Sequence, residues 1–122
     1  MKKILIVDDE AAFTGLLKKI LEKTGDYEVF IENTGSNAVA AGRAARPDLI
    51  FLDVVMPDIE GGEVAAQIEI DPVLKGTPIV FMTAVLSKDE ARAGVGSFGG
   101  YPYIAKPVTI QEVIATITKH AR

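Results

Sequence analysis

The stretch Ile50–Asp58, IFLDVVMPD, decides the fold because it places a carboxylate inside an apolar run. The residues before Asp53 have the continuous hydrophobicity of a strand that is buried on both faces of a sheet. An unpaired buried charge costs several kcal/mol, so a carboxylate in this position requires an explanation. Either the strand ends here and Asp53 caps it, or Asp53 has a chemical function.

Four other segments have the character of strands and, with this one, predict a sheet. The predicted strands are Ile4–Val7, Tyr27–Glu32, Leu49–Leu52, Ile79–Met82 and Tyr101–Ala105. The first, third and fourth are continuous apolar runs, which are typical of central parallel strands. The second partly alternates and suits a peripheral position. The fifth contains a proline, which favours the start of a strand or an edge position.

Segments with helical spacing separate these strands. Helices are predicted over residues 11–24, 36–45 and 61–70, and two more begin at the capping boxes Ser87–Glu90 and Thr109–Glu112. The first helix is expected to bury Phe13, Leu16, Leu17, Ile20 and Leu21, and the last to bury Ile110, Val113, Ile114 and Ile117. Because strand and helix alternate along the whole chain, we expect an α/β fold with a doubly wound parallel sheet.

The composition is that of one ordinary globular domain. The chain has 122 residues, 48% hydrophobic and 25% charged, which argues against disorder and predicts a single domain over residues 1–122. The net charge of -4 and the lack of a basic stripe give no indication of nucleic-acid binding. With no cysteine, disulfides and thiolate metal sites are excluded. No apolar run suits a membrane span or a signal peptide, so a soluble, cytoplasmic protein is expected.

Polar residues follow the predicted strands at their carboxyl ends, the edge at which open α/β sheets bind ligands. They are Asp8, Asp9 and Glu10 after the first strand, Asp53 after the third, Thr83 after the fourth and Lys106 after the fifth. Each alone has an ordinary explanation as a helix cap, a turn hydroxyl or a surface lysine. Their concentration at one edge of one sheet is better explained by a shared site.

Ionised acids that share a cleft repel one another, so their negative charge must be neutralised. Two unit charges about 4 Å apart interact by about 4 kcal/mol at an effective dielectric constant of about 20, so a cation must bind or one acid must keep its proton. Lys106 supplies only one positive charge. An all-oxygen ligand set suits Mg²⁺, which commonly handles phosphate when it is bound by few carboxylates. Asp8 and Asp9 are adjacent like a metal-binding pair, which leaves Asp53 as the better candidate for a nucleophile that forms an acyl phosphate.

Four short motifs make the chain similar to the receiver domain of response regulators in two-component signalling. They are Val7–Glu10, Asp53–Pro57 with Gly61, Met82–Ala84 and Tyr103–Pro107, and the resemblance covers the whole chain. It implies a flavodoxin-like (βα)5 fold with a five-stranded parallel sheet in the order 2-1-3-4-5.

The resemblance also implies a phosphoacceptor with a metal ion. Asp53 would accept the phosphoryl group. Asp9, Asp53 and the backbone carbonyl of Val55 would bind Mg²⁺ directly, and Asp8 would assist through water. Lys106 and Thr83 would contact the phosphoryl group.

A switch and its partners are implied in the same way. Thr83 and Tyr103 would change position after phosphorylation, which would control a downstream protein. The donor would be a histidine kinase or a histidine phosphotransfer protein, and the domain would be a monomer or a phosphorylation-dependent dimer. Weak self-catalysed phosphotransfer and dephosphorylation are expected, but no enzymatic function and no direct contact with nucleic acid or membrane.

Two features leave the output open. The glycine-rich segment Gly94–Gly100 is expected to shorten or loosen the fourth helix, because each helical glycine costs about 1 kcal/mol. No output domain follows the last predicted helix, so a stand-alone regulator and a receiver taken from a longer protein are both expected possibilities.

Three other classes of protein fit the sequence less well. A haloacid-dehalogenase-type phosphatase has a second aspartate two positions after its nucleophile, and this chain has Val55 at that position. A pseudo-receiver, which binds partners without phosphorylation, would lack part of the set of acids, threonine and lysine. A dinucleotide-binding or flavin-binding domain needs a glycine-rich first turn, where this chain has Asp8–Glu10.

Overall fold

The computed structural model describes residues 1–84 and 100–122, which contain one parallel sheet. Its strands are β1 (Lys2–Val7), β2 (Tyr27–Glu32), β3 (Leu49–Asp53), β4 (Ile79–Thr83) and β5 (Tyr103–Ala105). They lie in the order β2-β1-β3-β4-β5, and every neighbouring pair is parallel. This confirms the predicted doubly wound, flavodoxin-like fold and its strand order.

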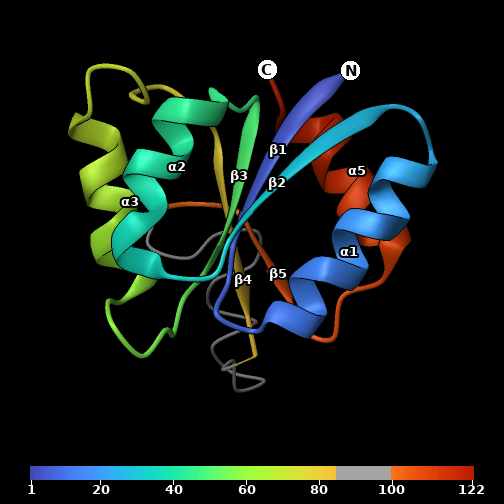
Figure 1. Ribbon diagram of the computed structural model, residues 1–122, viewed down its shortest axis with the longest axis horizontal. Helices are drawn as coiled ribbons and strands as arrows, with labels where there is room; N and C mark the ends of the chain where they lie inside the picture. The colour runs from blue at the N-terminus through green and yellow to red at the C-terminus, as the bar shows by residue number, and fades with distance from the viewer. Residues whose placement is uncertain (85–99) are drawn as a thin grey trace.

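The helices form a layer on each face of the sheet. The described helices are α1 (Ala11–Lys23), the 3-10 turn η1 (Gly35–Asn37), α2 (Ala38–Ala45), α3 (Gly61–Ile70) and α5 (Ile110–His120). Figure 1 shows α1 and α5 on one side of the sheet, and α2 and α3 on the other. The helix predicted from Ser87–Glu90 and residues 94–99 of the glycine-rich segment lie outside the described residues. Within residues 1–84 and 100–122, no helix combines the length and the apolar character needed to cross a membrane.

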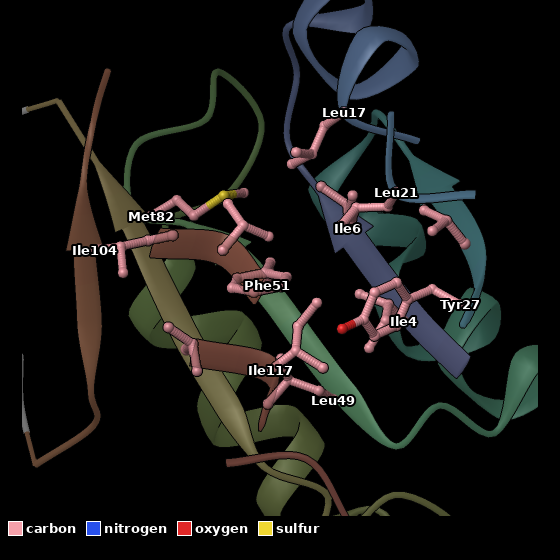
Figure 2. Close-up of a cluster of buried hydrophobic side chains, with 13 residues drawn as sticks. Ile4, Ile6, Leu17, Leu21, Tyr27, Leu49, Phe51, Met82, Ile104 and Ile117 are labelled. Carbon is pink, nitrogen blue, oxygen red and sulfur yellow. The ribbon is translucent and has the colours of Figure 1, made fainter. Parts of the chain in front are cut away.

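The central strands are buried on both faces, as their continuous apolar sequences predict. Every residue of β3 and β4 is buried. Alternate side chains point to opposite faces, so one strand contributes to two cores. Ile4, Ile6 and Phe51 pack with helices α1 and α5, as Figure 2 shows, whereas Leu5 and Leu52 pack on the side of α2 and α3.

The predicted buried face of α1 is partly wrong. Leu17 and Leu21 are buried, but Leu16 is 59% exposed and Ile20 is 38% exposed. The apolar residues of this helix form two rows with i, i+4 spacing, one with Leu17 and Leu21 and the other with Leu16 and Ile20. The two rows lie about 100° apart around the helix axis, because that is the angle between adjacent residues. The sheet covers the row of Leu17 and Leu21 together with Thr14, which turns the other row toward solvent.

Helix α5 begins as its sequence predicts. Thr109 is the N-cap, and its hydroxyl oxygen accepts a hydrogen bond of 3.1 Å from the backbone N–H of Glu112. Val113 and Ile117 are buried, and the more exposed Ile110 and Ile114 pack against the edge of the same core. The capped helix is therefore held along its apolar face beside α1.

Candidate functional site

A cleft of 160 Å³ opens at the carboxyl ends of the strands, and most of the predicted site residues line it. The lining residues are Asp9, Glu10, Asp53, Val55, Thr83, Ala84 and Lys106. Parallel pairing explains why they meet, because β1 and β4 flank β3 and all three strands end at this edge. In the ladders, Asp53 lies opposite Met82 and Thr83 lies opposite Ala105, the residue before Lys106.

Three carboxylates converge at this cleft, with Asp9 and Asp53 in its lining and Asp8 buried beside them. Asp8 and Asp9 follow β1 and Asp53 ends β3, and one carboxylate oxygen from each lies within 4.8 Å of the other two. Asp8 and Asp53 are buried, whereas Asp9 is exposed and leaves the group open to solvent. Carboxylate oxygens at this separation are the donor set of a hard divalent cation, so the residues fit Mg²⁺.

The crowding of acids changes the proton affinity of Asp53. Burial, and then the charge of Asp8, raise the pKa of Asp53 to about 6 from an ordinary value of 3.8. The charge of Lys106 and the backbone N–H of Val55 lower this pKa and a hydrogen bond with Asp9 raises it, and the value of about 6 is the net of all these effects. The ionised cleft is therefore short of positive charge, which is the condition in which a cation binds well.

Lys106 is the positively charged group among the described residues that line the cleft. Its ammonium nitrogen lies 2.6 Å from Asp8 Oδ2, 3.1 Å from Glu10 Oε1 and 3.9 Å from Asp53 Oδ1. The ring of Phe13 lies below it, with the ring centre 4.9 Å from the nitrogen. Burial lowers the pKa of Lys106, but its contacts with Asp8 and Glu10 outweigh burial, so the pKa is raised and the side chain stays charged.

The two predicted switch residues occupy different places. Thr83 is almost fully buried and lines the cleft. Tyr103 is half-buried at the start of β5 and packs against the core on the side of α2 and α3, so it does not line the cleft. The backbone N–H of Lys106 donates a 2.8 Å hydrogen bond to the carbonyl of Thr83. This hydrogen bond links the end of β4 to the end of β5, and so links the backbones of Thr83 and Lys106, whose side chains line the cleft.

Asn33 supports the site and was missed by sequence reasoning. Its amide nitrogen donates hydrogen bonds to the backbone carbonyl of Asp8, at 2.7 Å, and to Thr14 Oγ1, at 3.0 Å. These bonds tie the end of β2 to the turn that carries Asp8 and to helix α1. The available signal was an amide side chain directly after a strand that neighbours β1.

Gly61 has a steric reason for its place in the motif that follows Asp53. A Cβ atom at this position would lie 2.2 Å from the backbone oxygen of Asp53 and 2.9 Å from the Cα of Val54. The N–H of Gly61 also donates a 2.8 Å hydrogen bond to the carbonyl of Val54. The start of α3 therefore packs directly on the backbone of Asp53, which only glycine permits without a shift.

Comparison with known proteins agrees with this geometry. The family model of the response regulator receiver domain matches residues 4–118. The polar-differentiation response regulator DivK of Brucella anthropi is 33% identical over 120 residues, which cover 98% of this chain and 95% of DivK. The chemotaxis protein CheY4 of Vibrio cholerae has a solved structure with a TM-score of 0.82 and 29% identity, and the match covers 98% of both chains.

Other relatives are longer proteins. The transcriptional regulatory protein ResD of Bacillus subtilis is 40% identical over 117 residues, which cover 94% of this chain but 46% of ResD. The chain thus spans about half the length of several curated relatives that it matches. The family match, the sheet order and the acidic cleft lead to one conclusion: the chain belongs to the response regulator receiver domains of two-component signalling, a family of signalling domains that generally bind Mg²⁺ at an acidic pocket.

Proposed function

We propose that residues 1–122 form one receiver domain that accepts a phosphoryl group on Asp53 in a Mg²⁺-dependent reaction and then controls a protein partner. One observation carries the proposal. The Asp53 carboxylate opens into a cleft that it shares with two other acids, and the ammonium of Lys106 lies 3.9 Å from it. Such a cleft combines a nucleophile, a set of metal ligands and a positive charge for the transferred group.

The proposal assigns a role to each of the three acids. Asp9, Asp53 and the backbone carbonyl of Val55 would hold Mg²⁺ directly, and Asp8 would assist through a water molecule. When bound, the ion supplies charge neutralisation for the phosphoryl oxygens. The proximity of the three carboxylates and the raised pKa of Asp53 support this assignment, because both show that the acids need a counter-charge.

Phosphoryl transfer is an exchange of one bond for another. A carboxylate oxygen of Asp53 forms a bond to phosphorus, and the bond from phosphorus to the imidazole nitrogen of a donor phosphohistidine breaks. The electron pair stays on the imidazole, which leaves as the neutral ring with a proton on its other nitrogen. Lys106 needs only a short movement to contact an equatorial phosphoryl oxygen and stabilise the charge on it.

Thr83 and Tyr103 convert phosphorylation into a change of shape. The Thr83 hydroxyl donates to the new phosphoryl group, and Tyr103 moves inward behind it, which shifts a pre-existing equilibrium between two states. A shift from 1:99 to 99:1 requires a preference of about 5.5 kcal/mol. The pairing of Thr83 with Ala105, between Tyr103 and Lys106 in sequence, supports this route.

The partners follow from the chemistry of the site. The donor is a histidine kinase or a histidine phosphotransfer protein, and the target is a protein that distinguishes the two states. We expect a cytoplasmic domain that is monomeric or dimerises on phosphorylation, with slow self-catalysed phosphorylation and dephosphorylation.

Intact-mass spectrometry tests the proposal. The protein is incubated with Mg²⁺ and acetyl phosphate, and we expect a single phosphate adduct that is absent from Asp53→Asn. Asp58→Asn is the matched control, because it makes the same change in the loop that follows Asp53, at a carboxylate that accepts the N–H of Ser36. It should retain the adduct. A wild-type protein that binds Mg²⁺ but forms no adduct would instead be a pseudo-receiver.

A further inference from the structure

Among the described residues at the cleft, Glu10 is the one acid that the proposed chemistry does not use, yet its carboxylate contacts Lys106. Glu10 Oε1 accepts a hydrogen bond of 3.1 Å from the ammonium of Lys106. Glu10 also lines the cleft together with Asp53 and Thr83. Its side chain is therefore placed beside the position that a phosphoryl group on Asp53 would enter.

The backbone of Glu10 is fixed, so this contact follows from the fold. Glu10 is the N-cap of α1, and its carbonyl accepts a 3.1 Å hydrogen bond from the N–H of Thr14. Its own N–H donates a 3.0 Å hydrogen bond to Asp8 Oδ1. Because these bonds hold Glu10 on both sides, its side chain extends from a fixed point at the rim of the cleft.

Three carboxylates lie within 4 Å of the ammonium of Lys106 and compete for it. The ammonium of Lys106 is 2.6 Å from Asp8 and 3.1 Å from Glu10, but 3.9 Å from Asp53. The geometry points to Glu10 as a positioning residue that holds Lys106 back from Asp53 and so slows the uptake of the phosphoryl group. This inference rests on the proposed function and adds to it a residue that sets the rate.

The exposure of Asp8 and Glu10 indicates which of them Lys106 leaves more easily. The side chain of Asp8 is completely buried, whereas that of Glu10 is 61% exposed. Water screens the exposed pair and makes its contact with Lys106 the weaker one. Lys106 can therefore leave Glu10 first and reach toward Asp53 while it keeps Asp8. Glu10 acts as a restraint of modest strength and does not block the site.

The initial rate of phosphorylation by acetyl phosphate in Mg²⁺ tests the restraint. Glu10→Gln keeps the size of the side chain but removes its charge, and we expect about a twofold to fivefold faster uptake, the effect of losing one exposed ion pair. Glu60→Gln is the matched control, since it removes the same charge from the N-cap of α3. It should leave the rate unchanged, and an equal acceleration in both variants would overturn the inference.

Two further variants separate the contact from the general field of a negative charge. Glu10→Asp keeps the charge but shortens the side chain by one methylene, so it should accelerate uptake as Glu10→Gln does. Combining Glu10→Gln with Lys106→Met should abolish the acceleration that Glu10→Gln causes alone. If Glu10→Asp matches the wild type, or if the acceleration persists without Lys106, Glu10 does not act through Lys106.

A measurement without catalysis completes the test. A double-mutant cycle of Glu10→Gln and Lys106→Met, read by urea unfolding without Mg²⁺, should show that the two side chains stabilise each other. Zero coupling overturns the inference even if the rates change. Failure of the wild type to form an adduct removes the proposed function itself, whereas a normal wild type with an unchanged Glu10→Gln rate removes only the role of Glu10.

Discussion

At the scale of single residues, the position of Asp53 is set by the backbone around it. Asp53 is the last residue of β3, and the carbonyl of the next residue accepts the N–H of Gly61. The first turn of α3 consequently packs against the peptide that carries the proposed phosphoacceptor. A side chain at position 61 would therefore clash with the backbone of Asp53.

We therefore expect Gly61→Ala to damage both stability and phosphorylation. Its Cβ would lie 2.2 Å from the Asp53 carbonyl oxygen, and relief of such overpacking costs about 1–3 kcal/mol. Urea unfolding measures the loss of stability, and the acetyl phosphate assay measures the loss of rate. Gly62→Ala is the control, because a Cβ there meets no atom within 4 Å. The control should be neutral or slightly stabilising. Equal behaviour of the two variants would contradict this explanation.

Most of the candidate site could be predicted because its residues follow strands. Asp8, Asp53, Thr83 and Lys106 each come directly after, or at the end of, an apolar run, and parallel strands bring such positions to one edge. The contribution of Asn33 could not be predicted, since its partners are a backbone carbonyl and a hydroxyl that only the fold brings near. The roles proposed for individual side chains stay predictions.

At the scale of elements, the helices differ in how firmly their ends are held. Among the described helices, α5 has a side-chain cap at its N-terminus, because Glu112 N–H donates to Thr109 Oγ1. Helices α1 and α3 have Glu10 and Glu60 as N-caps, and neither side chain makes such a bond. Helix α5 follows the loop that carries Lys106, so its cap also fixes the end of that loop.

Removing this cap should therefore lower the stability of the domain. Thr109→Ala loses the hydrogen bond to Glu112, and we expect a loss of about 1 kcal/mol in the free energy of unfolding. Thermal or urea unfolding measures it. Thr109→Ser keeps the hydroxyl and should unfold close to the wild type. If the serine variant is as unstable as the alanine variant, the methyl group of Thr109 matters and the cap does not.

The boundaries of elements were predicted well where local sequence decides them. The apolar runs of β3 and β4 and the capping box of α5 are signals contained within a few residues. The start of α2 was predicted two residues early, at residue 36, because residues 35–37 form η1 and the N–H of Ser36 donates to Asp58 in the loop after β3. The partner is remote in sequence, so local spacing does not reveal it. The exposure of Leu16 and Ile20 on α1 could not be predicted for the same reason, because it depends on which side of the helix packs against the sheet.

At the scale of the whole molecule, the cleft affects the stability of the fold. Asp53 has a pKa of about 6 in the folded chain, above its ordinary value of 3.8, so the folded state binds this proton more tightly than the unfolded state. Stability therefore decreases as the pH rises from about 4 to about 6 and is constant above that range with respect to this group. Without metal, the domain is less stable at neutral pH because of its own site.

We expect Asp53→Asn to remove this penalty. In urea unfolding with a chelator, the variant should match the wild type near pH 4 and exceed it by about 1–3 kcal/mol above pH 6. The lowered pKa values of Asp58 and Asp71 act in both proteins and cancel in the difference. Mg²⁺ at pH 7 should stabilise the wild type more than the variant. A difference that does not change with pH would contradict the assignment of the proton to Asp53.

The arrangement of the strands also has a mechanical consequence. Strand β3 is buried along its whole length and is bonded to β1 and β4, whereas β5 has three residues and, among the described strands, β4 as its one neighbour. In the described sheet β3 is therefore held on both sides and β5 on one, so we expect the backbone near Tyr103 to be displaced more easily than the backbone at Asp53. Substitutions on the surface around β5 are consequently expected to disturb the end of β3 less than substitutions beside Asp53 do, so this edge of the sheet can vary in sequence with little effect on the cleft.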